Sequence, residues 1–480
     1  MPEAPDDAPN GASQSSWLDR LPAIGIGLAV VGIAVAAYWL PGSMRFFNHF
    51  VWQALAFLDG RAAITWPVDG PGLAGNAYFQ DVYPVLGPDG QQTGFGLLPF
   101  PPLPALILVP FVAVWGLATD VRLISVGLGA IAAGLAWWAL GQLAISRAIR
   151  LVTTLFFALG TVFWYAAQLG TTWFFAHVVA VSCLLLAVGI ALGGDPRADE
   201  PEDAPSPRAF AAGLAAGLRR PLGLLDGRQL LAGFLFGLAC TARLTIVFGA
   251  PFFMFVGSGG SMLRRSVSAG LGAAIPIGLL LVYNLATTGH FVHPGYDYLY
   301  HLEATGYPGL HYNPAWSVED VRYIPQNLRI MFLSAPVILP DVVPSSVSAG
   351  RALCVDPGAV RGLFDGDCPI ALPRDVGMSL ILTSPAYLLA LAAFVQGRSR
   401  LVIGSTLAIV AIAVVNLMHF SQGWVQFGYR FSNDFVVFAM LLVAVGMSRR
   451  GGVGLVGIGL VAVSIAINAW GVIWGNIQGW

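Results

Sequence analysis

Long uncharged apolar runs dominate this 480-residue chain and limit what it can fold into. Hydrophobic residues make up 56% of the sequence and charged residues only 10%, whereas a soluble domain carries about 25% charge. Several runs are long enough for a helix to cross the ~30 Å hydrocarbon core of a bilayer. The ~10-residue alternating segments of a transmembrane β-barrel are missing. The pattern therefore predicts an all-α, polytopic transmembrane helical bundle.

The positions of the runs predict eleven membrane spans, or twelve if the run at 229–256 breaks at Arg243. The other ten runs are 21–40, 100–118, 122–144, 150–167, 171–192, 267–288, 376–395, 401–418, 430–448 and 452–474.

Polar segments divide the chain into four parts. Residues 1–20 are acidic and contain proline, which predicts a disordered tail. A first transmembrane module, 21–288, contains a first external loop at 41–98. A large external loop follows at 289–375, and residues 376–480 form the C-terminal transmembrane helices.

Arginine clusters favour the cytoplasmic side of a membrane. Three clusters can be cytoplasmic together: Arg264–Arg265, Arg398 with Arg400, and Arg449–Arg450. This arrangement places the 289–375 loop outside. With an external first loop and single crossings after it, Arg147 and Arg150 fall outside, against the rule. Placing them inside requires a broken 229–256 segment and one more change of direction upstream. We favour an external first loop and leave the span count open.

Two of the four cysteines lie in the large external loop. Cys354 and Cys368 are 14 positions apart, and an oxidising compartment would favour a disulfide between them. The alternative is two free thiols. Cys183 and Cys240 lie in apolar runs and are interpreted as small core residues.

The first external loop contains candidate acid–base residues. Residues 45–58 place apolar side chains on one helical side, which predicts an amphipathic helix at the membrane interface. Asp59 follows that helix. Asp81 is flanked by aromatic and apolar residues, a setting that can raise a carboxylate pKa toward the working range of a general base. The alternative for both is an ordinary loop cap or turn former.

Arg243, Arg430 and Asp434 are charged residues that lie within apolar runs, where charge is costly. Arg243 is a candidate phosphate ligand, because guanidinium groups match phosphate oxygens; the alternative is an arginine that snorkels to the interface. Arg430 and Asp434 either neutralise each other at i, i+4, or Arg430 faces a ligand and Asp434 orients it. Gln426 and Tyr429 are supporting candidates for a polar pocket beside Arg430.

Other functional classes find little support. The net charge of −1 gives no reason to expect a nucleic-acid partner. His290 and His293 have HxxH spacing, but no cysteine or carboxylate completes a recognisable metal site. We therefore assign no metal ligands and no definite cofactor, while a divalent metal stays open. Phosphate-cradling loops and nucleophile elbows are absent from the sequence.

Two short segments and the overall layout resemble the GT-C class of membrane glycosyltransferases, which includes protein O-mannosyltransferases and lipid A aminoarabinose transferases. FPPLP at 100–104 resembles the PPL element that opens the second span in that class. GLACTARLT at 237–245 resembles its glycine-then-basic segment, with Arg243 as the basic residue. Where the class has acidic residues after the first span, this chain has Asn48 and His49. The resemblance thus implies either that Asp59 or Asp81 has become the base, or that catalysis is lost.

The resemblance also implies a function. A polyprenyl-phosphate-linked sugar would be the donor, and a glycan, lipid or protein of the cell envelope the acceptor. A first-loop carboxylate would deprotonate the acceptor for inverting attack, while Arg243 and Arg430 stabilise the departing phosphate. The enzyme would be integral to the bacterial inner membrane with its active site on the external face. Two alternatives are a transporter or flippase of an anionic or lipid-linked substrate, and a non-catalytic scaffold for envelope assembly.

Overall fold

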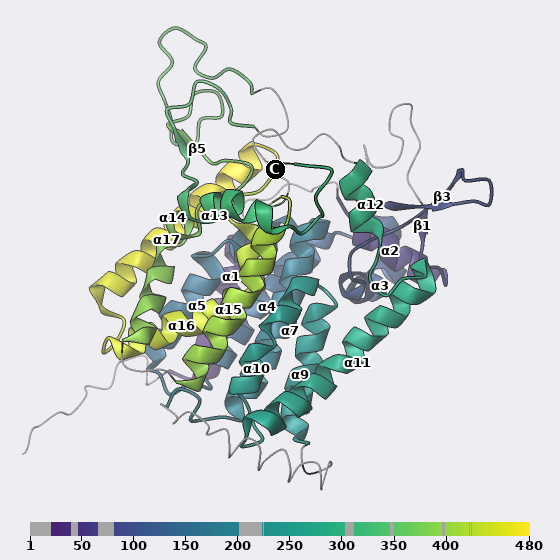
Figure 1. Cartoon of the computed structure of the whole chain (residues 1–480). Helices are drawn as coiled ribbons and strands as arrows, with labels where there is room; N and C mark the ends of the chain where they lie inside the picture. The colour runs from purple at the N-terminus through teal and green to yellow at the C-terminus, as the bar shows by residue number, and fades with distance from the viewer. Residues whose placement is uncertain are drawn as a thin grey trace, which may run out of the picture.

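The computed structural model describes residues 21–39, 47–65, 81–200, 223, 225–302, 312–345, 350–395, 399–421, 423 and 425–480. The tail at 1–20, predicted to be disordered, lies outside these residues. The described chain is a helical bundle with its connecting loops gathered mainly at one end (Figure 1).

Apolar runs form helices because a backbone in lipid must satisfy its own hydrogen bonds. The bundle contains α1 (Ala23–Trp39), α4 (Val121–Leu140), α5 (Arg147–Leu159), α6 (Phe163–Leu169), α7 (Thr172–Gly193), α9 (Gly227–Cys240), α10 (Pro251–Phe255), α11 (Met262–Thr288), α14 (Leu380–Thr383), α15 (Arg400–Met418), α16 (Val436–Arg449) and α17 (Gly454–Ile477).

Five of the described helices are long and apolar enough to cross a membrane: α4, α7, α11, α15 and α17. The pair α5 and α6 makes a sixth if it is one span bent by 52°. The other runs form shorter apolar helices. The run at 376–395 contains the 3₁₀ segment η7 (Pro385–Phe394), and the run at 430–448 begins with the 3₁₀ segment η8 (Arg430–Asp434). The chain is therefore a polytopic helical membrane protein, while the count of eleven or twelve spans stays a prediction.

The run at 229–256 is a hairpin that turns at Arg243. Helix α9 ends at Cys240, Arg243 is extended (φ −142°, ψ 109°), and η5 (Leu244–Gly249) leads into α10. Gln229, near the start of α9, donates from Nε2 to the carbonyls of Phe253 (2.8 Å) and Val256 (3.2 Å). Both ends of the segment therefore lie together, and Arg243 lies at its apex.

The predicted span at 100–118 does not run from one end of the bundle to the other. Its helix, α3 (Leu103–Trp115), has 13 residues and rises only about 20 Å. The Leu103 amide donates to the Thr241 carbonyl at the hairpin apex. The segment η3 (Gly116–Ala118) follows and packs against α2 (His49–Leu58). Asp120 then caps the start of α4. Helices α2 and α3 lie together near α12 (Gly295–Leu302) (Figure 1).

These two departures bring the arginine clusters to one end of the bundle, opposite α12 and α13 (Ile324–Leu333). We call these ends the arginine end and the loop end. Arg147 donates to the Leu21 carbonyl (2.6 Å) at the start of α1, and Trp137, near the end of α4, donates to Ala23. In the loop 194–200, Asp195 forms an ion pair with Arg400 and Asp199 forms one with Arg449. Arg398 lies outside the described residues.

The loop end adds short strands to the predicted all-helical fold. Helix α2 occupies the part of the predicted interfacial helix that the structure describes. After it, β1 (Ile64–Thr65), β2 (Tyr83–Leu86) and β3 (Gln92–Leu97) form an antiparallel sheet in the order β1-β3-β2. The second loop contains η6 (Val321–Tyr323), α13, and a two-stranded sheet of β4 (Val337–Ile338) and β5 (Ala371–Leu372). Alternation over so few residues is too weak a signal to read from the sequence.

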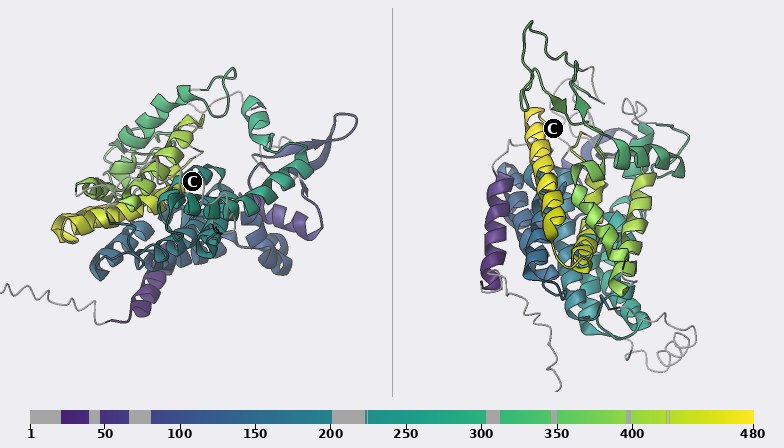
Figure 2. Two further views of the ribbon diagram at one scale, coloured as in Figure 1. Left: turned by 60° about the horizontal axis from the view of Figure 1, so that its bottom comes forward. Right: turned by 90° about the vertical axis from the view of Figure 1, so that its left-hand side faces the viewer.

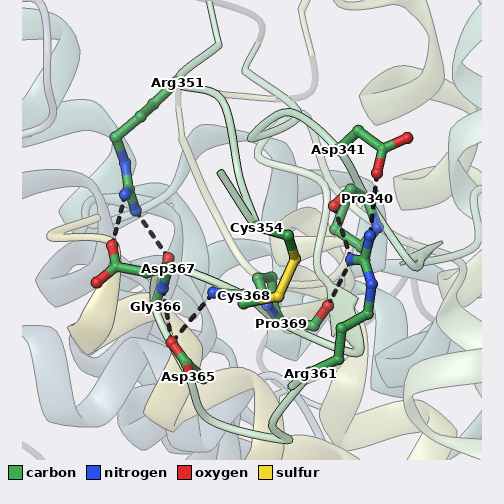
Figure 3. The surroundings of a disulfide bond; sticks show 10 residues. All are labelled: Pro340, Asp341, Arg351, Cys354, Arg361, Asp365, Gly366, Asp367, Cys368 and Pro369. Atoms are coloured by element: carbon green, nitrogen blue, oxygen red, sulfur yellow. Dashed lines mark hydrogen bonds and ion pairs between the residues drawn. A yellow bond between two sulfur atoms is a disulfide. The ribbon is translucent and has the colours of Figure 1, made fainter. Parts of the chain in front are cut away.

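A disulfide between Cys354 and Cys368 closes the second loop (Figure 3). Arg351 pairs with Asp367 at 2.6 Å and Arg361 with Asp341 at 3.0 Å on either side of it. The loop projects beyond the C-terminus at the loop end (Figure 1 and Figure 2). A small apolar cluster of Leu353, Leu372 and Trp474 joins its base to the end of α17.

Candidate functional site

A pocket of about 200 Å³ lies where the bundle meets the first and second loops at the loop end. Five of its lining residues have acidic or basic side chains: Asp81, Arg243, Glu319, His419 and Arg430. They come from the first loop, the hairpin apex, the second loop, the end of α15 and η8. The pocket therefore exists only when segments far apart in the sequence pack together.

Asp81 is held in an unusual conformation. Its φ of 61° lies in the left-handed region, which is uncommon for non-glycine residues, although aspartate adopts it more readily than most. Its Oδ2 accepts a hydrogen bond from the Trp173 indole (2.7 Å). Burial raises the pKa of the Asp81 carboxyl, while the Trp173 N–H and the positive charges of Arg430 and His419 lower it, leaving a net rise above 3.8. A carboxylate of this kind is suited to accept a proton.

Asp434 organises the hairpin apex. Arg243 binds it with two parallel bonds, Nε to Oδ1 at 3.1 Å and Nη2 to Oδ2 at 2.9 Å. Thr245 Oγ1 donates to Asp434 Oδ2 at 2.7 Å, and Asn416 Nδ2 does so at 3.2 Å. His177 Nδ1 lies 3.0 Å from Asp434 Oδ1. A buried carboxylate with this many donors fixes the orientation of Arg243 toward the pocket.

This arrangement differs from both sequence interpretations of Asp434. Residues 430–434 form the 3₁₀ segment η8 rather than an α-helix. With three residues per turn, positions four apart no longer lie one above the other. Asp434 instead forms its ion pair with Arg243, 191 positions away. The sequence identified Asp434 as a positioning residue but associated it with the wrong arginine.

Arg430 lines the pocket and is 7% exposed. Its guanidinium lies over the rings of Phe174 (5.2 Å) and Phe431 (5.3 Å), contacts that favour a cation. The backbone of Gly423 passes so close that a Cβ there would lie 2.7 Å from Arg430 Nε. Gly423 thus leaves the space that the Arg430 side chain occupies.

The other sequence candidates lie outside the pocket lining. Asp59 is exposed and pairs with Arg61 at 2.7 Å. Asn48 precedes α2 without a side-chain cap, and His49 is buried with its Nδ1 2.8 Å from Thr172 Oγ1. Tyr429 and Gln426 are buried, and the Gln426 amide donates to the Val376 carbonyl at 3.3 Å. Their predicted roles are untested, but the structure gathers only Asp81, Arg243 and Arg430 around one pocket, with Asp434 behind Arg243.

Several pocket residues were missed by sequence reasoning. Glu319 and His419 face each other with His419 Nδ1 3.3 Å from Glu319 Oε1, and Trp173 holds Asp81. Trp173 lies near the start of α7, His419 follows the end of α15, and Glu319 lies in the second loop. No local sequence pattern at these positions predicts a place in a pocket. Among the described residues, no group of three or more histidine, cysteine, aspartate or glutamate side chains could hold a metal ion.

The two segments that resemble the GT-C class both border this pocket. Phe100 and Pro101 of FPPLP and Arg243 and Thr245 of GLACTARLT are lining residues. The hydrogen bond from Leu103 to Thr241 joins the two segments directly.

No protein-family model and no curated protein matches the chain. Among solved structures, the fold is similar to the apo crystal structure of the Archaeoglobus fulgidus oligosaccharyltransferase, with a TM-score of 0.43 and 11% sequence identity. The match covers 97% of this chain and 56% of that one, so the chain spans about half the length of that protein.

Proposed function

We propose that the chain is a membrane glycosyltransferase that takes a sugar from a polyprenyl-phosphate donor and transfers it to an acceptor of the cell envelope. The observation that carries the proposal is the shared pocket. A half-buried carboxylate with a raised pKa, Asp81, and two guanidinium groups, Arg243 and Arg430, line the same cavity. Sugar transfer from a phosphate needs both a base and a cationic site for the leaving group.

In the proposed reaction Asp81 takes the proton of an acceptor hydroxyl. The acceptor oxygen attacks the anomeric carbon and forms the new glycosidic bond as the bond from that carbon to the phosphate oxygen breaks. The bonding electrons leave with the lipid phosphate, whose charge Arg430 and Arg243 stabilise. Attack opposite the leaving phosphate inverts the anomeric centre. Asp434 acts as a positioning residue, because it orients Arg243.

The membrane orientation follows from charge. The arginine end carries Arg147, Arg264, Arg400 and Arg449, so the positive-inside rule makes it cytoplasmic. The pocket and the disulfide-bonded loop then face the external, oxidising side. In a bacterium this membrane is the inner membrane. Residues 21–288 are then an N-terminal transmembrane module with the first external loop, residues 289–375 a large external loop, and residues 376–480 the C-terminal transmembrane helices.

The test uses purified protein in liposomes with labelled polyprenyl-phosphate sugars and an envelope extract as acceptor. We expect wild-type protein to transfer label, and Asp81→Asn to lose about 10²–10⁴-fold in rate, the usual contribution of a general base. Asp59→Asn is the matched control, because Asp59 is an exposed carboxylate of the same loop that is paired with Arg61; it should retain full activity. Full transfer by Asp81→Asn would contradict the mechanism. Lipid movement across vesicles without transfer would favour a transporter.

A further inference from the structure

The outer wall of the pocket is built from a short antiparallel contact between the second external loop and the segment after α15. Glu319 and His419 lie opposite each other in this contact. The Asp320 amide donates to the Met418 carbonyl (2.8 Å), and the Phe420 amide donates to the Val318 carbonyl (2.9 Å). Directly opposed residues place their side chains on the same face, and both side chains line the pocket.

The wall is rigid. The buried Asn327 of α13 donates from Nδ2 to the carbonyls of Leu417 (2.8 Å) and His419 (2.7 Å). The side chain of Glu319 nevertheless stays 52% exposed and that of His419 23% exposed. A held backbone that presents accessible polar groups to a cavity is an arrangement suited to binding.

Aromatic rings complete the same wall. Phe420 and Tyr300 line the pocket with their ring centroids 5.2 Å apart. Tyr300 is held by bonds to the Asn313 carbonyl and the Tyr323 hydroxyl (2.7 Å). Tyr300 is buried behind Phe420, so the partly exposed Phe420 ring supplies the apolar surface of the wall, beside a carboxylate and an imidazole.

This combination suits a sugar ring. A carboxylate has two acceptor oxygens and no donor, which matches neighbouring hydroxyl groups that donate together. The C–H face of a pyranose is apolar and packs on an aromatic ring through dispersion and weak C–H contacts. An acyl chain has no hydrogen-bond donor for the Glu319 carboxylate, which would be desolvated with His419 Nδ1 near Oε1 as its side-chain partner.

We propose that Glu319, His419, Phe420 and Tyr300 form a subsite for a hexose ring of the acceptor, so that the acceptor is an oligosaccharide. The inference rests on the proposed function, since it assigns the acceptor half of that pocket. Asp81, which lines the same pocket and is less exposed than Glu319, meets the ring that reacts. The Glu319 subsite holds a neighbouring ring nearer the solvent.

Binding of a linear tetrasaccharide of neutral hexoses tests the subsite without a donor. Saturation-transfer NMR on the full-length protein in lipid nanodiscs measures its affinity. We expect wild-type protein to bind it and Glu319→Gln to bind about tenfold more weakly, the effect of losing one charged hydrogen-bond acceptor. Asp297→Asn is the control, because Asp297 is an exposed carboxylate on α12 outside the pocket lining. No binding by wild type, or equal binding by Glu319→Gln, would overturn the proposal.

A second measurement separates this inference from the proposed function. With a labelled donor, Glu319→Gln should raise the KM for the tetrasaccharide about tenfold and leave the KM for the donor unchanged. If wild type transfers sugar to serine-containing peptides, and the tetrasaccharide neither accepts nor competes, the subsite is wrong while the enzyme stands. If the tetrasaccharide binds through Glu319 but no donor is turned over, the subsite stands while the glycosyltransferase proposal fails.

Discussion

Asp81 combines an uncommon backbone conformation with a raised carboxyl pKa. Its left-handed φ of 61° is maintained by the strands and the Trp173 indole around it. Burial raises the pKa of the carboxyl, and the Trp173 hydrogen bond offsets only part of this rise. The ionised form is the one that acts as base, so the transfer rate should rise with pH through this raised pKa, above the ordinary value of 3.8.

Trp173→Phe provides a signed test of this pH dependence. The Trp173 N–H stabilises the ionised carboxylate, so its removal should raise the pKa further and move the acid limb of the rate profile to higher pH. Phenylalanine keeps an aromatic ring against Phe47 and His49. Trp115→Phe, at an exposed tryptophan at the end of α3, is the control. A limb that stays in place or moves to lower pH would count against Asp81 as the base.

Substitution of Gly423 by alanine tests whether the position of the Arg430 guanidinium matters for donor binding. A Cβ at this position would lie 2.7 Å from Arg430 Nε, so Gly423→Ala should push the guanidinium away from the pocket. We expect the KM for the polyprenyl-phosphate donor to rise roughly tenfold, the scale of one charged contact. Gly358→Ala carries the same backbone strain (φ 92° against 102°) but meets nothing within 4 Å. Equal donor affinity in the two variants would show that Arg430 does not contact the donor.

At the scale of elements, the hairpin of α9, η5 and α10 depends on close packing against α11. A Cβ on Gly233 would lie 2.6 Å from the Cα of Ala269, and one on Gly272 would lie 2.7 Å from the Phe234 amide. Small residues allow two helix backbones to approach this closely in a membrane. The contact matters for function because α9 carries Arg243 at its end.

Two glycines of α11 allow a matched test of this contact. Gly272→Ala should lower the free energy of unfolding by about 1–3 kcal/mol through overpacking. Gly270→Ala, with nothing within 4 Å, gains the same helix propensity, about 1 kcal/mol, and should be at least as stable as wild type. Thermal unfolding in nanodiscs measures both. Equal melting temperatures for the two variants would mean that the helices can separate without cost.

At the scale of the whole molecule, the disulfide-bonded loop and the arginine clusters lie at opposite ends. Together they predict the membrane orientation, which surface labelling can measure. In intact cells a membrane-impermeant maleimide should modify Asp89→Cys, in the turn between β2 and β3, and leave Ser261→Cys, before α11, untouched. Permeabilised cells should label both. The reverse pattern would place the pocket on the cytoplasmic side.

Sequence alone determined the class of this protein, because apolar length and the absence of charge are enough to force a chain into membrane helices. It also singled out Arg243, Arg430, Asp434 and Asp81 as candidates, since a charge in an apolar run or an acid among aromatics is conspicuous by itself. It left open whether the 229–256 run breaks, and that break together with the position of α3 resolves the conflict over Arg147.

Only the tertiary structure decided which of these residues meet. Asp434 pairs with Arg243 across 191 positions, and Glu319 meets His419 across 100. Local pattern carries no information about such pairs, because they depend on how helices pack and where the chain turns back. The desolvation cost of burying a charge depends on the residue type, which is known from the sequence alone. Which partner offsets that cost depends on how the helices of the bundle pack.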